Sequence, residues 1–156
     1  AAQGYRTDEI RAVLAPFSGD VPSRMRALDA LHRAHATPAF PALVEVYKRV
    51  NNILRQAAGK FARIEGNVDL GMLSAAEVTL ISRVRETAAA LDAAARSGDF
   101  DRVITTLIGL KPAVDAFFDE VLVFDANPEV ALNRIRIVQS LAALFAPLGR
   151  LEHLQQ

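Results

Sequence analysis

The spacing of apolar residues is the feature that most restricts the fold of this 156-residue chain. Apolar residues recur every three or four positions along almost the whole sequence, and no segment alternates as a half-buried strand does. Hydrophobic residues make up 51% of the chain, which is enough for a core and too many for an intrinsically disordered sequence. The pattern therefore predicts an all-α protein, a single helical bundle of about six to eight helices.

Local signals predict where the helices of the second half begin and end. Ser74 and Glu77 form a capping box, which places a helix start directly after Ser74. Ser97-Gly98 ends that helix, and Asp99 caps the next one. Asn127-Pro128 begins the last long helix, because the asparagine side chain can accept a hydrogen bond from a free backbone N–H and proline suits the first helical turn. Including the first half, we expect breaks near Pro16, His35, Gly71, Gly98, Pro112 and Asn127.

Three helices are predicted in the first half of the chain. The first follows Thr7, and the second begins at Asp20 to Pro22 and ends near His35. Thr37-Pro38 is expected to open the third helix, which should extend to about Ala57. A short helix and a loop should then occupy residues 59–71.

Nothing in the sequence divides residues 1–156 into two domains, so we expect one helical domain. The chain begins without a methionine, as a fragment of a longer subunit would. It has no cysteine, no signal peptide and no apolar stretch of the roughly 20 residues that span a bilayer. We expect a cytoplasmic location and no membrane partner.

Charge is balanced over the whole chain but not along it. The 18 basic residues equal the 18 acidic ones, whereas a stand-alone nucleic-acid binder is usually basic. On a helical wheel of the third predicted helix, long cationic and amide side chains gather opposite the apolar arc, where they could contact phosphates and base edges. An ordinary solvated helix face would look similar. The candidate RNA-binding residues are Lys48, Arg49, Asn52 and Arg55, followed by Lys60 and Arg63.

Four further polar residues are predicted to have structural roles. Asn51 falls on the apolar arc, so its amide should be hydrogen-bonded to neighbouring backbone, since an unsatisfied buried amide costs about 1–3 kcal/mol. Arg134 falls near the centre of the buried face of the last helix. A buried arginine needs a carboxylate, and Asp115 and Asp119 are the expected partners.

No pattern in the sequence supports catalysis. His32 and His35 are three residues apart, but no third ligand stands beside them and no HExxH motif is present, so two surface histidines are the simpler explanation. Phosphate-binding loops, dinucleotide-binding glycine motifs and nucleophile elbows are also missing from the sequence. We expect a non-catalytic chain that holds neither a metal nor a cofactor.

Two stretches resemble a known family. Residues 46–54 contain the run KRVNNIL, and residues 114–123 read VDAFFDEVLV, followed by NRI at 133–135 and LAALF at 141–145. Their order and spacing resemble the C-terminal region of the bacterial glycyl-tRNA synthetase beta subunit. Residues 4–14 and 25–28 are similar to the region just upstream, while residues 146–154 depart from the family's usual ending.

The resemblance implies a fold and a function. That C-terminal region is an all-helical anticodon-binding domain of the DALR type, also found in arginyl-tRNA synthetase, where Arg49 would correspond to an arginine of the matching helix. It implies binding of the glycine tRNA anticodon loop at its pair of cytosines. The partners implied are the rest of the beta subunit and an alpha subunit that uses ATP and Mg to make glycyl-adenylate; DNA is not expected. The chain would thus be a non-catalytic part of an ATP-dependent ligase.

A second hypothesis belongs to another class of function. A helical bundle can also be an interaction module whose grooves bind a partner protein helix. A basic face beside a concavity would favour RNA, whereas an apolar groove of several hundred Å² would favour a protein partner.

Overall fold

The computed structural model describes residue 6, residue 9 and residues 21–148. In that part of the chain every regular element is helical, with six α-helices, two short 3-10 helices and no strand. The prediction of an all-α fold is confirmed. Apart from Glu9, the helix predicted after Thr7 and the break predicted near Pro16 lie outside the described residues.

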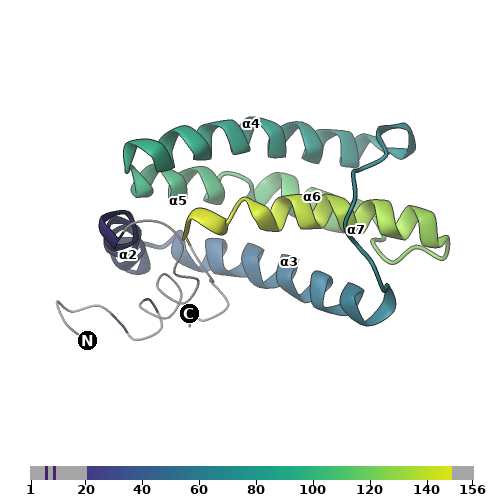
Figure 1. Ribbon diagram of the computed structural model, residues 1–156, viewed down its shortest axis with the longest axis horizontal. Helices are drawn as coiled ribbons and strands as arrows, with labels where there is room; N and C mark the ends of the chain where they lie inside the picture. The colour runs from purple at the N-terminus through teal and green to yellow at the C-terminus, as the bar shows by residue number, and fades with distance from the viewer. Residues whose placement is uncertain (1–5, 7–8, 10–20, 149–156) are drawn as a thin grey trace.

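The long helices lie side by side in a bundle. α3 (Phe40–Lys60) and α7 (Pro128–Ala143) pack against each other, and α4 (Ala75–Ser97) lies on the opposite side of α7 from α3 (Figure 1). α5 (Phe100–Ile108) and α6 (Lys111–Glu120) both pack along α4. α2 (Val21–His35) crosses one end of the bundle and contacts α5.

The core lies around α7. Ile135, Ile137, Val138 and Leu141 of this helix have no exposed surface, because α3 covers one side of α7 and α4 the other. The short 3-10 helix η3 (Ala146–Leu148) follows α7 and buries Leu148 against α2. Burial of side chains of this size stabilises the fold by about 1.5–3 kcal/mol each.

Most of the predicted helix ends are confirmed. Ser74 accepts a hydrogen bond from the Glu77 backbone, and Glu77 accepts one in return, which completes the capping box at α4. Gly98 ends α4 in the left-handed conformation at φ 77°, where glycine carries no Cβ penalty. Asp99 and Asn127 cap α5 and α7 through their side chains.

The predicted start and end of the third helix are wrong. α3 begins at Phe40 after Ala39, which provides no side-chain cap, and it continues to Lys60 rather than ending near Ala57. The Thr37 hydroxyl does not cap α3, because it donates to the Ala34 carbonyl and closes the turn after α2.

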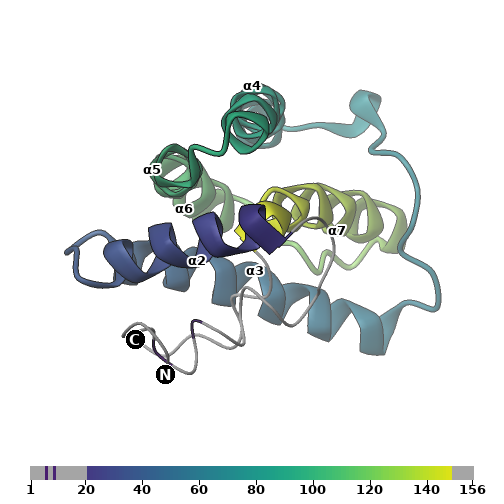
Figure 2. The same cartoon turned by 60° about the vertical axis from the view of Figure 1, so that its left-hand side comes forward.

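The connection from α3 to α4 runs along the outside of the bundle. After Lys60 the chain leaves α3 in an irregular segment, forms the 3-10 helix η2 (Leu70–Met72) and reaches Ser74, the N-cap of α4 (Figure 2). The short helix and loop expected in residues 59–71 are therefore η2 and this segment, with the helix displaced toward Met72. The connection brings residues 61–69 alongside α7.

Candidate nucleic-acid interface

The amphipathic sequence of α3 places three polar side chains in one row on its outer side. The helix buries its apolar face, including Leu43, Val46 and Val50, against the core. Because residues three or four apart share a helix face, the outward side presents a row at i, i+4 and i+7. We call this row, Lys48, Asn52 and Arg55, the outer strip; all three side chains are exposed.

Arg49 does not belong to the outer strip. Its Nη1 lies 3.4 Å from Asp115 Oδ1 on α6, and its guanidinium carbon lies 4.6 Å from the centre of the Phe118 ring. The side chain is 40% exposed, so the arginine can be reached from solvent while part of its charge is already neutralised. The predicted row of four residues is therefore corrected: the structure turns Arg49 toward α6.

The neighbouring charges extend this ion-pair network. Lys111 Nζ lies 2.8 Å from Asp115 Oδ2 and 3.7 Å from Glu45 Oε1. The hydrogen bond to Asp115 raises the pKa of Lys111 above its usual value. Two cations and two carboxylates thus balance on this flank, which offers little free positive charge to a phosphate.

The last two predicted cations continue beyond the outer strip. Lys60 ends α3 and places its ammonium 4.5 Å from the centre of the Phe124 ring, an arrangement that holds the charge at the surface. Arg63 is exposed in the irregular segment after α3. The six candidate residues therefore follow α3 into that segment, with Arg49 turned toward α6 and Lys60 toward Phe124 in the loop after α6.

The predicted partners of Arg134 are wrong. Its Nε lies 2.8 Å from Glu77 Oε1, and its Nη1 donates to the Leu122 carbonyl at 2.7 Å and lies 3.4 Å from Asp125. Asp115 instead pairs with Arg49 and Lys111, and Asp119 is exposed. The wheel placed Arg134 correctly toward the bundle, but it could not show that the first turn of α4 lies across from it.

Glu77 is the most buried acidic partner in this arrangement, with a side chain only 1% exposed. Burial by itself would raise the pKa of Glu77. Hydrogen bonds from the Ser74 backbone N–H and from Arg134 outweigh that effect, and the pKa lies below its usual value. The carboxylate is therefore ionised at neutral pH and joins the start of α4 to α7.

Asn51 also departs from the prediction. The residue is only half-buried, and within the described residues its amide has no hydrogen-bond partner, so the predicted tie to neighbouring backbone is wrong. Asn133 has that kind of role instead. Its Oδ1 accepts from the Asp69 N–H at 2.6 Å and its Nδ2 donates to the Asp69 carbonyl at 3.1 Å.

Arg136 was not singled out from the sequence, although it organises the connection between α3 and α4. Its guanidinium donates to three backbone carbonyls, those of Ile64, Glu65 and Asn67. Gly66 adopts φ 145° under this guanidinium, and a Cβ there would lie 2.7 Å from Arg136 Nη2. The local sequence pattern does not indicate this contact, because Gly66 and Arg136 lie far apart in the sequence.

The two adjacent histidines contact a carboxylate. His32 Nδ1 and His35 Nδ1 lie 2.8 and 2.7 Å from the two oxygens of Glu9, which is fully buried. The His35 side chain is 11% exposed and stacks on Phe40, so the interpretation of two surface histidines is wrong for His35. Across the described part of the chain, no group of three or more potential ligands is arranged to hold a metal ion.

Comparison with known proteins identifies the class of this domain. Residues 43–151, which take in most of α3 and all of α4 to α7, match the DALR anticodon binding domain, and the chain belongs to that family. No helix among the described residues has the length and apolar character needed to cross a membrane.

The chain is also similar to about one fifth of the length of named proteins, as three examples show. The chain is 36% identical over 152 residues to the glycine–tRNA ligase beta subunit of Anaeromyxobacter sp. (strain K), covering 97% of this chain and 21% of the relative. It is 37% identical over 143 residues to that of Thiobacillus denitrificans, covering 89% and 20%. For Desulfatibacillum aliphaticivorans the identity is 31% over 145 residues, covering 93% and 21%. The family resemblance seen in the sequence is confirmed, and the chain spans about one fifth of the length of these relatives.

Proposed function

We propose that this chain binds the anticodon loop of a glycine tRNA and thereby supports the charging of that tRNA by a glycine–tRNA ligase. The observation that carries the proposal is the match of residues 43–151 to an anticodon-binding domain family. The choice of glycine is supported by relatives that are named glycine–tRNA ligase beta subunits.

The outer strip is the part of the surface where the loop would bind. Lys48 and Arg55 carry charge that no carboxylate among the described residues neutralises, and Asn52 between them has an amide that can pair with a base edge. Arg63 extends the positive charge along the next segment. A chain with no net charge binds RNA weakly by itself, but contacts elsewhere in a larger protein raise the effective affinity.

The proposal includes the assembly in which the domain works. The chain would be a non-catalytic part of a beta subunit, with an alpha subunit using ATP and Mg to activate glycine in the cytoplasm. DNA and membranes would not be partners. The role of this domain would be to position the tRNA, so its variants should alter tRNA charging and leave glycyl-adenylate formation near normal.

Binding of glycine tRNA and of an anticodon-swapped version, measured at several salt concentrations, tests this function. Each phosphate contact to a single strand contributes about −0.7 to the slope of log affinity against log salt. Lys48→Ala and Arg55→Ala should each weaken binding and reduce the slope by about that amount. Arg102→Ala on α5 is the matched control, because it also removes one exposed positive charge that no carboxylate among the described residues neutralises, and it should leave the slope unchanged.

Two further variants separate charge from base recognition. Asn52→Ala removes no charge and should reduce discrimination between the cytosines of the anticodon and other bases, with the slope preserved. Arg49→Ala should change the slope less than Arg55→Ala, because Asp115 already neutralises part of its charge. If the Lys48, Asn52 and Arg55 variants all charge tRNA like the wild type, the outer strip is an ordinary solvated face.

One observation favours the alternative, a helical protein-interaction module. Four large apolar side chains are exposed among the described residues, and all lie in η2, early α4 or the loop between α6 and α7, where Arg134 joins α4 to that loop. Protein-facing surfaces often expose such residues. Two results together would support this second function: the chain binds another part of the ligase saturably, and substitution of the four exposed apolar residues leaves tRNA affinity unchanged. The four residues are Leu70, Met72, Val78 and Leu122.

A further inference from the structure

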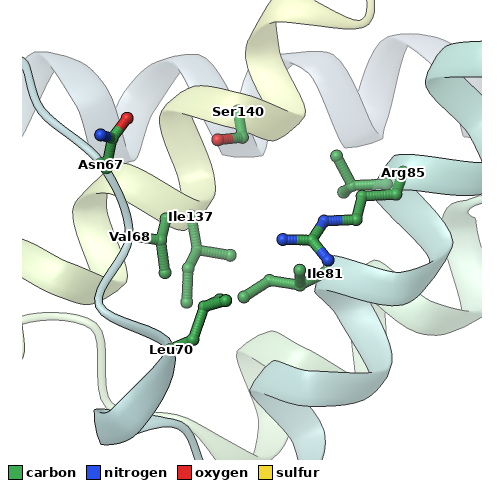
Figure 3. A pocket seen from close by; sticks show the side chains of 8 residues that line it. Asn67, Val68, Leu70, Ile81, Arg85, Ile137 and Ser140 are labelled. Atoms are coloured by element: carbon green, nitrogen blue, oxygen red, sulfur yellow. The ribbon is translucent and has the colours of Figure 1, made fainter.

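A hollow of about 380 Å³ lies where the connection from α3 meets α4 and α7 (Figure 3). The volume is within the range of about 300–1,000 Å³ that small-molecule sites occupy. One wall comes from the irregular segment and η2, one from α4 and one from α7. The lining residues are Asn67, Val68, Leu70, Ile81, Val84, Arg85, Ile137 and Ser140.

The hollow combines apolar walls with a few polar groups. Figure 3 shows the Arg85 guanidinium reaching over the hollow from α4, while the Asn67 and Ser140 side chains lie at its other margin. The Ser140 hydroxyl donates to the Arg136 carbonyl, so its oxygen remains able to accept a hydrogen bond. A planar cation, an amide and a hydroxyl around aliphatic side chains are suited to a flat, polar-edged ligand.

Charge distinguishes this hollow from three other hollows on the described surface. A hollow between α2 and α5 contains Arg33 with Asp101, one beside α7 contains Asp92, and one between α4 and α5 contains Asp99. The hollow at Arg85 has no carboxylate in its lining, and within the described residues Arg85 has no ion pair. The site therefore favours an electron-rich ligand.

The wall formed by the irregular segment is fixed before any ligand arrives. Arg136 holds the carbonyls on either side of Gly66, and Asn133 holds both backbone groups of Asp69. Asn67 and Val68 lie between these two anchors. A wall that needs no ordering on binding costs the ligand less affinity.

We propose that this hollow receives the base of one unpaired nucleotide of the tRNA loop, an inference that rests on the proposed function. RNA-binding proteins recognise unstacked bases by stacking them on arginine planes and by hydrogen bonds to their edges. Arg85 provides the plane, the aliphatic walls exclude water, and Asn67 and Ser140 meet the polar edge. An aliphatic peptide side chain would instead bury the Arg85 guanidinium without a partner, which is costly.

The path of the chain connects the hollow to the outer strip. The irregular segment begins where α3 ends, carries Arg63, and supplies Asn67 and Val68 to the hollow. Cations on α3 and in this segment would hold phosphates of the loop while one base turns into the hollow. Phosphate contacts position a nucleic acid and base contacts specify it, and the two sites divide those tasks.

The test combines abasic substitution in the loop with substitutions in the hollow. Affinities are measured with the complete ligase carrying this chain and with glycine tRNA in which each unpaired anticodon-loop nucleotide is made abasic in turn. One abasic position should weaken wild-type binding about tenfold, the scale of losing one stacked base. Val84→Phe, which fills the hollow, should weaken the intact tRNA similarly and remove the penalty at that position alone.

Arg85→Ala provides a second variant that does not threaten folding, because Arg85 is exposed. It should weaken intact tRNA several-fold and reduce the penalty at the same abasic position. Arg83→Ala is the control for position: Arg83 is an exposed arginine of α4 outside the hollow, paired with Glu86 at 3.6 Å, so all abasic penalties should persist. If both hollow variants behave like this control while the wild type still binds glycine tRNA selectively, the base site is refuted and the proposed function stands. If the wild type does not distinguish glycine tRNA from an anticodon-swapped one, both proposals are refuted.

Discussion

Replacing Arg134 by methionine tests the tie between α4 and α7 most directly. Methionine keeps much of the length of the side chain and removes its charge, so Glu77 remains as a buried carboxylate without its cation. Breaking a buried pair in this way costs about 3–5 kcal/mol. Because the Ser74 N–H still binds Glu77 and Arg134 is 18% exposed in the wild type, we expect the lower end, about 3 kcal/mol.

Urea and thermal unfolding of the chain at pH 7 measure this cost. For a chain of this length each kcal/mol corresponds to about 2–4 °C in Tm, so the variant should melt roughly 6–12 °C lower. Adding Glu77→Gln should recover part of the loss, because the double variant no longer buries an unpaired charge. A loss below about 0.5 kcal/mol, typical of a neutral surface substitution, would refute the reasoning.

The pH dependence of stability tests independently whether Glu77 is the group left unpaired in Arg134→Met. In the wild type the pKa of Glu77 lies below its usual value, so this carboxylate stabilises the fold above the unfolded-state pKa and loses that contribution as pH falls through the folded one. In Arg134→Met, burial without the cation favours the protonated form. The stability difference between the two proteins should therefore narrow as pH is lowered from 7 toward 4. A constant difference would show that Glu77 is not the group left unpaired.

Two other predictions concern the connection between α3 and α4. Gly66→Ala should cost about 1–3 kcal/mol, because φ 145° is unfavourable for a residue with a Cβ and because Arg136 must move. Gly59→Ala should instead stabilise the fold by about 0.5–1 kcal/mol, because Gly59 lies within α3 with open space around it, and urea unfolding of the two variants compares them directly. Asn133→Ala should cost about 1–3 kcal/mol, because it leaves the Asp69 N–H without its partner and the Asp69 carbonyl with only the Met72 N–H; it should also speed amide hydrogen exchange at Asp69, and unchanged exchange would mean that the segment is held by other contacts.

The sequence alone determined the features that depend on neighbours within one helical turn. The cap at Ser74, the left-handed end at Gly98 and the start at Asn127 were predicted because each depends on hydrogen bonds to residues at most five positions away. The outward direction of Lys48 and Arg55 also followed, since helical spacing fixes which side chains share a face. The family resemblance rested on ordered runs of residues and likewise required no structure.

Only the tertiary structure decided which distant side chains meet. Arg134 contacts Glu77 across 57 positions, and Arg136 contacts Ile64 across 72, so no local pattern could select these partners. Arg49 was expected beside Lys48, but Asp115 and Phe118 on α6 turn it aside. A helical wheel gives the direction of a side chain and not what lies opposite. The packing of α6 against α3 determines which positive charges on α3 remain without a carboxylate partner. The packing of α4 against α7 forms the hollow at Arg85.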